Sequence, residues 1–284
     1  MTDSVLTGPM AEHIAPPSWR TVEIVSDLHL HADAHATLAL WRSYLQHSRA
    51  DAIFILGDLF EVWVGDDAAA RPGFEADCAR DLRAAANARP LFFMHGNRDF
   101  LVGTAFARQA GLTLLADPTV LVFAGQRWLL SHGDALCLSD PSYQKFRAWV
   151  RLRASQQAFL TLPLFARRYL ARRARERSQS HQKYLMAEAA SAIQTEAQTQ
   201  TADAAMAWGD VDTPAARSWL EQASAKVLIH GHTHRPARHA LDAQRERIVL
   251  GDWDGRAPHP RARALRLSAE GAAYIDLADP DGRP

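Results

Sequence analysis

Five short apolar runs in this chain each end in a polar cluster that contains Asp, Asn or His. The clearest run covers residues 227–229, and the sequence His-Gly-His-Thr-His follows it directly at 230–234. Apolar and β-branched runs bounded by polar residues and glycine predict buried strands. Because ligands of open α/β sheets bind outside the carboxyl ends of the strands, we expect the five clusters to meet at one place. The other four clusters cover residues 26–29, 57–58, 95–99 and 131–134.

The spacing of these clusters predicts an α/β fold with one insertion. From Asp27 to His132 successive clusters lie roughly 30–40 residues apart, and a βαβ unit needs roughly 30 residues or more. Stretches rich in Ala, Leu and Arg at 36–48 and 74–88 predict connecting helices. The interval from His132 to His232 is far longer than one crossover needs, which indicates an inserted segment.

Composition indicates the cellular compartment of the protein but identifies no binding partner. Lys+Arg and Asp+Glu both number 32, so the net charge favours neither an acidic nor a basic ligand. Cys78 and Cys137 are the only cysteines; they offer no disulfide framework and no thiolate metal cluster, which fits a reducing compartment. Residues 1–20 lack the apolar core of a signal peptide, and no apolar run is long enough to span a bilayer. We therefore expect a cytoplasmic protein with a loose tail at 1–20.

The polar clusters contain the ligand types of a metal site. Carboxylates, imidazoles and one amide oxygen, with no sulfur, favour Mn, Fe or Zn over a structural zinc site. The set is too large for one catalytic ion with an open position, and it suits two ions about 3.5–4 Å apart that share a carboxylate. Singly, each residue has a plainer explanation, because an Asp after a strand usually caps a helix and a lone His is usually a satisfied polar group. The candidates are Asp27, His29, Asp58, Asn97, His132, His232 and His234.

Five short motifs carry a resemblance to a known superfamily. They are DLH at 27–29, GD at 57–58, GN at 96–97, HGD at 132–134 and GHTH at 231–234. Their order and gaps resemble the five blocks of the calcineurin-like metallophosphoesterases, over about residues 21–251. The resemblance implies a four-layer α/β/β/α sandwich with a dinuclear site in which Asp58 bridges the ions. It implies that one ion is held by Asp27, His29, Asp58 and His234, and the other by Asp58, Asn97, His132 and His232.

Longer stretches around these motifs narrow the resemblance. They read SDLHL, ILGDLFEVWVGDD, HGNRDF, SHGDALC and IHGHTHRP. In them the chain is similar to the UDP-2,3-diacylglucosamine hydrolases, whereas protein phosphatases of the superfamily follow the GD motif with Asp-Arg-Gly. The resemblance implies a Mn²⁺ enzyme of lipid A biosynthesis, peripheral on the cytoplasmic face of the inner membrane. It implies attack of metal-activated water on the uridine-side phosphorus of UDP-2,3-diacylglucosamine, yielding UMP and 2,3-diacylglucosamine 1-phosphate (lipid X).

Arg98 is a catalytic candidate besides Asp58. A guanidinium is a poor proton donor because its pKa exceeds about 12, but it can hold phosphate oxygens bidentately and offset developing charge. A phosphate leaving group, with a second pKa of about 6, needs little protonation, so Arg98 suits a diphosphate substrate. The alternative is a structural arginine that pairs with Asp99 or another acid.

Residues 145–177 combine basic and apolar side chains, with Glu176 as the only acid. Pro163 divides the stretch, which predicts two helices. Such a pair can lie on an anionic membrane surface or form a lid with an apolar lining for acyl chains. The same arginines could instead contact nucleic acid or form a solvated helical face. The motif resemblance favours the lipid, and we expect no nucleic-acid partner. The expected division is a core at 21–138 and 206–284 and a helical lid at 139–205.

The resemblance also implies contacts with the lipid substrate. Near the metal ions they are Asn97, Arg98 and His232, and in the lid they are Asp140, Tyr143, Phe146, Arg147 and Ser178. The family carries Asn and Lys shortly after the serine, where this chain departs with Gln182 and Leu185. We expect a monomer. The alternative enzyme is a nuclease or nucleotide phosphodiesterase with the same metal site, and the non-enzymatic alternative is a membrane-bound, metal-holding interaction module.

Overall fold

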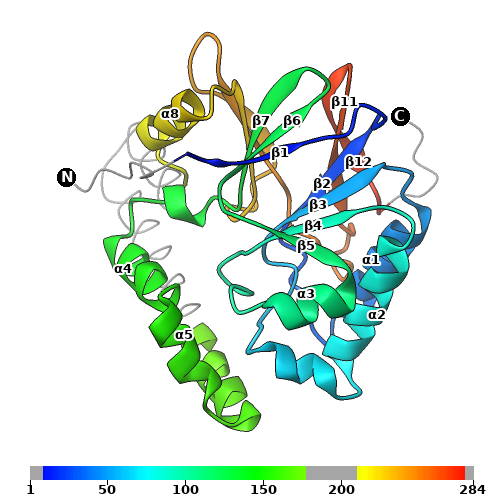
Figure 1. The fold of residues 1–284 in the computed structure, drawn as a ribbon, viewed down its shortest axis with the longest axis vertical. Coiled ribbons are helices and arrows are strands. Elements are labelled where there is room, and N and C mark those ends of the chain that lie inside the picture. The colour runs from blue at the N-terminus through cyan, green and yellow to red at the C-terminus, as the bar shows by residue number, and fades with distance from the viewer. Residues whose placement is uncertain (1–8, 177–209, 279–284) are drawn as a thin grey trace. The chain divides into compact units, whose positions relative to one another are not determined.

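The computed structural model describes residues 9–176 and 210–278 (Figure 1). The chain divides into two compact units. The first unit contains residues 1–134 and 213–284, and the second contains residues 135–212. The lid expected over 139–205 falls inside the second unit.

Two six-stranded sheets form the first unit. In one, the order is β12 (Gly271–Asp276), β11 (Arg263–Ser268), β2 (Val22–Val25), β3 (Ala52–Leu56), β4 (Leu91–Met94) and β5 (Leu112–Leu115). In the other, the order is β1 (Ala11–Ile14), β6 (Thr119–Phe123), β7 (Gln126–Ser131), β8 (Val227–His230), β10 (Glu246–Val249) and β9 (Ala237–Ala240). Strands β2 to β5 run parallel in the first sheet, and β7, β8 and β10 run parallel in the second.

Helices lie on the outer face of each sheet, which gives four layers (Figure 1). Two of the helices on the β2–β5 sheet nearly coincide with the predicted stretches 36–48 and 74–88, and the predicted α/β/β/α sandwich is confirmed. These helices are α1 (His35–His47), α2 (Phe74–Ala86) and α3 (Thr104–Ala110), while α8 (Thr213–Gln222) lies against β8. Two short 3₁₀ helices are η1 (Asp66–Ala70) and η2 (Asp134–Leu136).

Alternating side chains of the central strands build two cores. Along β3, Ile53 and Ile55 pack with the helical layer, while Phe54 and Leu56 fill the space between the sheets. A parallel sheet that is covered on both faces has no solvent-facing residues, so its strands read as continuous apolar runs. Burial on both sides also holds the carboxyl ends of these strands in fixed positions.

The N-terminal segment departs from the prediction. Residues 11–14 form β1, which pairs in parallel with β6, so the loose tail expected over 1–20 is wrong for this part. The imidazole of His13 packs with its ring centroid 4.5 Å from that of Phe92 and 5.9 Å from that of Phe54. Without β1, β6 would be the edge strand of its sheet and would offer unpaired backbone groups. Main-chain pairing of this kind leaves little trace in residue composition. Residues 1–8 lie outside the described part.

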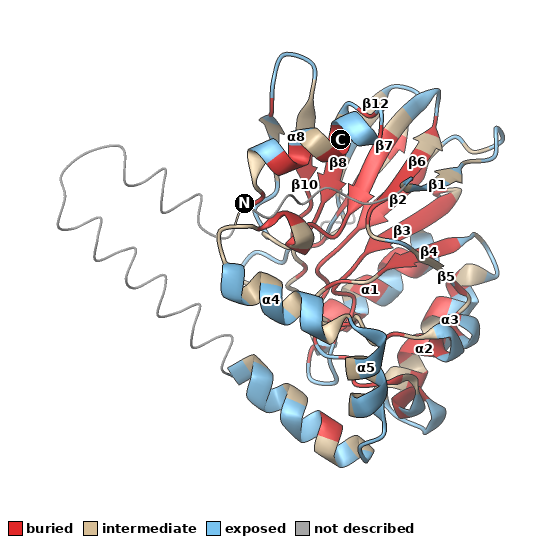
Figure 2. Cartoon of the chain, turned by 60° about the vertical axis from the view of Figure 1, so that its left-hand side comes forward, coloured by how far each residue is buried: buried red, intermediate tan, exposed pale blue. Residues whose placement is uncertain are grey.

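The second unit is helical where it is described. It contains α4 (Pro141–Val150), α5 (Arg153–Leu160) and a helical stretch at 164–176, with Pro163 between the last two as predicted. The prediction of two helices missed the break at 151–152, which separates α4 from α5. No residue of α4 or α5 is buried (Figure 2). Within 9–176 and 210–278, no helix has the length and apolar character needed to cross a membrane.

Candidate metal centre

The carboxyl ends of five strands bring the seven predicted ligands to one site. Asp27 and His29 follow β2, Asp58 follows β3, Asn97 follows β4, His132 follows β7, and His232 and His234 follow β8. Hydrogen bonds join neighbouring loops: the Asp27 N–H donates to the Gly57 carbonyl at 3.2 Å. The His232 N–H donates to Oδ2 of Asp27 at 2.9 Å, and this bond connects the two sheets at the site.

Asp27, His29 and His234 form a first cluster. Nε2 of His234 lies 3.1 Å from Oδ1 of Asp27 and 3.3 Å from Nε2 of His29. Nε2 of His29 lies 3.9 Å from Oδ1 of Asp27. Ligands held about 2.0–2.2 Å from one ion stand roughly 3–3.5 Å apart. The three atoms are therefore spaced much like ligands around a single cation.

Asn97, His132 and His232 form a second cluster beside Asp58. Oδ1 of Asn97 lies 2.9 Å from Nε2 of His132 and 3.0 Å from Nδ1 of His232. Oδ1 of Asp58 lies 3.8 Å from Nε2 of His132. Ligand atoms of Asp27, Asp58 and His132 all lie within 4.8 Å of one another. Asp58 thus links the two clusters, which is the position expected of a bridging carboxylate.

The hydrogen bonds of His132 indicate that the second cluster suits a cation. Its Nδ1 lies 2.9 Å from the backbone carbonyl of Leu56, so this nitrogen carries a proton and donates it. A neutral ring then directs the Nε2 lone pair toward the oxygen of Asn97. Converging lone pairs repel one another unless a positive charge lies among them. The donor set therefore fits divalent metal ions, as the ligand types predict.

Glu61 supports the first cluster. Its Oε2 lies 3.1 Å from Nδ1 of His29, which leaves Nε2 of that ring to face the cluster. Histidine ligands usually donate their other N–H to a carboxylate or a backbone carbonyl, and this fixes their tautomer and orientation. Glu61 was not predicted as a site residue, because only the fold shows that its carboxylate reaches His29. The one signal was its position in the stretch that follows Asp58.

Asp99 holds the loops after β3 and β4 together. Its carboxylate accepts the backbone N–H groups of Asp58, Leu59, Phe60 and Gly96 at 2.8–3.3 Å. The Asp99 carboxylate, which the sequence offered as a structural partner of Arg98, is thus bound to backbone N–H groups. The Arg98 backbone N–H donates to Oδ1 of Asp58 at 2.8 Å. Its side-chain Nε is buried and has no hydrogen-bond partner within the described residues, so it can still bind an anion.

The backbone of the ligand loops is strained. Five of the predicted ligands have φ between 49° and 66°, in the left-handed region that non-glycine residues rarely adopt. Such conformations cluster at functional sites, where the surrounding structure enforces them. At Gly96 a side chain would collide with the carboxylate of Asp58, so glycine is needed there for close packing of the loops. The five ligands are Asp27, His29, Asp58, His232 and His234.

Burial and neighbouring charges shape the electrostatics of the site. Burial raises the pKa of Asp58. Burial also lowers the pKa of His132, but the carboxylates of Asp58, Asp134 and Asp27 outweigh this and raise it to about 9. Burial and the neighbouring His132 lower the pKa of His232 to about 3. Without a cation, the carboxylates thus favour a proton on His132; a bound metal ion would supply that positive charge instead and leave His132 neutral, as His232 already is.

The remaining predicted residues belong to the second unit. Asp140 precedes α4, and its Oδ1 accepts the backbone N–H of Tyr143 at 2.9 Å, so it is the N-cap of that helix. Phe146, on α4, is 51% exposed, and Arg147 follows it. Ser178 lies outside the described residues.

Comparisons with known proteins identify the family of this chain. The family model of calcineurin-like phosphoesterases matches residues 21–236. A protein of Xanthomonas campestris pv. campestris, named UDP-2,3-diacylglucosamine hydrolase, is 43% identical over 91% of this chain and 99% of its own. One of the same name from Pseudomonas paraeruginosa is 40% identical over 88% of this chain and 96% of its own.

Solved structures resemble the chain only weakly. An archaeal phosphodiesterase has a TM-score of 0.42 and 11% identity, over 90% of this chain and 99% of its own. Similarity of that degree says nothing about the reaction. The family model and the two relatives, in contrast, match most of the chain. The chain therefore belongs to the calcineurin-like phosphoesterases and, among them, to the UDP-2,3-diacylglucosamine hydrolase family.

Proposed function

We propose that this chain hydrolyses the pyrophosphate bond of UDP-2,3-diacylglucosamine, a step of lipid A biosynthesis. The products are UMP and 2,3-diacylglucosamine 1-phosphate. The observation that carries the proposal is the cluster of seven ligand-type side chains at five strand ends, in a chain that matches relatives of this name over nearly their whole length.

Two divalent ions, with Mn²⁺ as the proposed metal, fit this cluster. When bound, they would supply charge that activates water and stabilises the phosphate oxygens. Asp27, His29 and His234 would hold one ion, and Asn97, His132 and His232 the other, with Asp58 shared. Glu61 and the Leu56 carbonyl support this role because each fixes a histidine tautomer.

Arg98 is the proposed residue for the substrate's phosphates. Its backbone bond to Asp58 fixes its Cα beside the shared carboxylate, and its buried Nε has no partner among residues 9–176 and 210–278. A guanidinium there would bind phosphate oxygens and stabilise charge as the lipid phosphate leaves, after attack at the uridine-side phosphorus. Asn97 and His232 would contact the same phosphate group.

The second unit is the proposed binding surface for the lipid. Its large apolar side chains are exposed, with Phe165 at 76% and Trp149 at 59%. Acyl chains gain about 0.8 kcal/mol per buried methylene on such a surface. Nearby arginines would attract an anionic membrane, which supports binding at the cytoplasmic face of the inner membrane. The protein is proposed to act there as a monomer. The lid contacts with the sugar are proposed for Asp140, Tyr143, Phe146, Arg147 and Ser178.

Product identification by mass tests the proposed function. Purified protein with Mn²⁺ is expected to convert UDP-2,3-diacylglucosamine to UMP and the lipid phosphate, and a chelator should stop the reaction. Single-stranded DNA and bis-p-nitrophenyl phosphate serve as competing substrates. Faster cleavage of DNA than of the lipid would favour the nuclease alternative, and no turnover of any substrate would favour an interaction module.

A further inference from the structure

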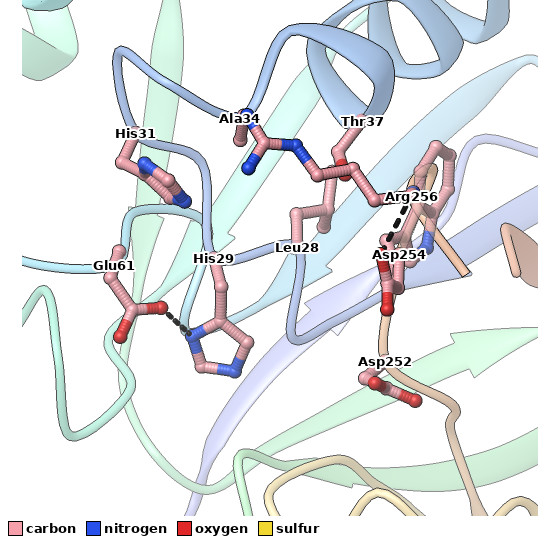
Figure 3. A pocket seen from close by; sticks show the side chains of 10 residues that line it. Leu28, His29, His31, Ala34, Thr37, Glu61, Asp252, Asp254 and Arg256 are labelled. Atoms are coloured by element: carbon pink, nitrogen blue, oxygen red, sulfur yellow. Dashed lines mark hydrogen bonds and ion pairs between the residues drawn. The ribbon is translucent and has the colours of Figure 1, made fainter. Parts of the chain in front are cut away.

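A cavity of about 220 Å³ lies beside the first cluster (Figure 3). His29 belongs to both, because it lines the cavity and its Nε2 lies 3.3 Å from Nε2 of His234. All the lining residues belong to the first unit. Pockets that enclose a complete ligand usually measure about 300–1,000 Å³. This cavity therefore suits one part of a larger substrate whose reacting group lies at the metal centre.

The chemistry of the lining restricts which part fits. Carboxylates disfavour a phosphate, and acyl chains would displace water from these polar groups without offering hydrogen bonds in return. A neutral group that carries hydroxyls is the better match, because carboxylates of nucleotide-binding proteins commonly accept hydrogen bonds from ribose. Trp253 and Leu28 add apolar surface. The polar and charged lining includes Glu61, Asp252, Asp254, His31 and Arg256.

We propose that this cavity receives the uridine of the substrate, with Asp252 accepting hydrogen bonds from the ribose hydroxyls. The inference rests on the proposed function, because the ligand is the nucleotide half of that substrate. The diphosphate is anionic and belongs with the cations, and the glucosamine carries the acyl chains. Apart from Ile14 and Val62, the large exposed apolar side chains of the described residues lie at 146–170, in the other unit. The uridine is the neutral part that remains.

Neighbouring contacts hold Asp252 in position for this role. Arg261 donates to Oδ2 of Asp252 at 2.8 Å, which orients the carboxylate and leaves lone pairs on its oxygens. The backbone N–H of Trp253 donates to the Asp27 carbonyl at 3.1 Å, so the segment is bonded to a metal-ligand loop. The buried indole of Trp253 packs edge-on against Trp41, which fixes the segment to the core.

Binding of UMP and of 2′-deoxyuridine monophosphate to the Mn²⁺-loaded protein tests the inference. The wild type is expected to bind UMP about tenfold more tightly, the effect of one hydrogen bond to a charged group. Asp252→Ala should bind the two nucleotides equally and should raise the KM for UDP-2,3-diacylglucosamine about tenfold with little change in kcat. Binding of inorganic phosphate, which reports on the metal centre, should stay unchanged. Asp252→Asn keeps the shape of the side chain and should weaken the preference if the alanine variant does not fold.

The matched control is Asp276→Ala, which removes an exposed carboxylate that also pairs with an arginine, Arg263. This variant should keep the preference for UMP. Equal binding of both nucleotides by the wild type, or an unchanged preference in Asp252→Ala, overturns the inference even when the protein hydrolyses the lipid. A UMP preference that depends on Asp252 in a protein that does not hydrolyse the lipid overturns the proposed function and leaves the nucleoside site standing.

Discussion

The metal-ligand loops and the helices of the second unit depart from the usual rule of burial in opposite directions. His132 and Asp58 are polar yet 0% and 2% exposed, whereas Phe165 and Trp149 are apolar yet 76% and 59% exposed. Buried polar groups persist where hydrogen bonds or ions satisfy them, and exposed apolar patches mark binding surfaces. The contrast supports the proposal that the loops carry the chemistry and the helices recognise apolar ligands.

The largest expected effect comes from the shared carboxylate. Asp58→Asn should lower turnover about a thousandfold or more on every substrate, because it removes the charge that both ions would share. The shape and the Arg98 backbone bond are retained, so the melting temperature of the metal-free protein should not fall. Asp77→Ala, which removes a half-exposed carboxylate of α2, is the control. Near-normal turnover of Asp58→Asn would contradict the two-ion site.

Removing the Arg98 side chain should slow the hydrolysis of both the lipid substrate and soluble phosphodiesters. Arg98→Ala is expected to lower kcat about a hundredfold, the typical cost of losing one group that stabilises transition-state charge. Arg98→Lys should recover only part of the rate, because an ammonium cannot bind bidentately. Arg80→Ala, on the exposed face of α2, should leave kcat unchanged in the same assay. A kcat unchanged in Arg98→Ala would return this residue to a structural role.

Glu61 provides a test that does not depend on turnover. Glu61→Ala should weaken Mn²⁺ binding about 10–100-fold, measured by calorimetry or electron paramagnetic resonance, because His29 loses the carboxylate that orients it. Glu61→Gln can still accept the His29 N–H and should recover part of the affinity. Equal Mn²⁺ affinity in wild type and Glu61→Ala would show that the loops orient His29 without this contact.

A substitution in the second unit should have a smaller effect, and only on the lipid substrate. Phe165→Ser should raise the KM for UDP-2,3-diacylglucosamine about tenfold, because burying one aromatic side chain contributes about 1.5–3 kcal/mol. Hydrolysis of bis-p-nitrophenyl phosphate should not change, since that substrate has no acyl chain. Gln156→Ser, in α5, controls for a change in the same unit. An equal loss of activity on both substrates would contradict a role of the second unit in binding the acyl chains alone.

The strand ends were predictable because each ligand lies next to a run that is buried on both faces. Runs such as residues 227–229 identify strands locally, and their polar ends follow from sheet topology. The roles of Glu61 and Asp99 were not predictable, since each depends on a partner far away in sequence. The proposed role of Asp252 depends on the fold as well, because the backbone N–H of Trp253 joins this segment to the distant Asp27. Strand β1 escaped prediction for a similar reason, because it is held by main-chain pairing with β6.

Strand β1 has a practical consequence for anyone who shortens this protein. Removing residues up to 15 would uncover β6, whose sequence Thr-Val-Leu-Val-Phe is apolar and β-branched. Bare edges of that kind recruit strands from other molecules and promote aggregation. Truncated versions should therefore precipitate even though every ligand-bearing loop is intact.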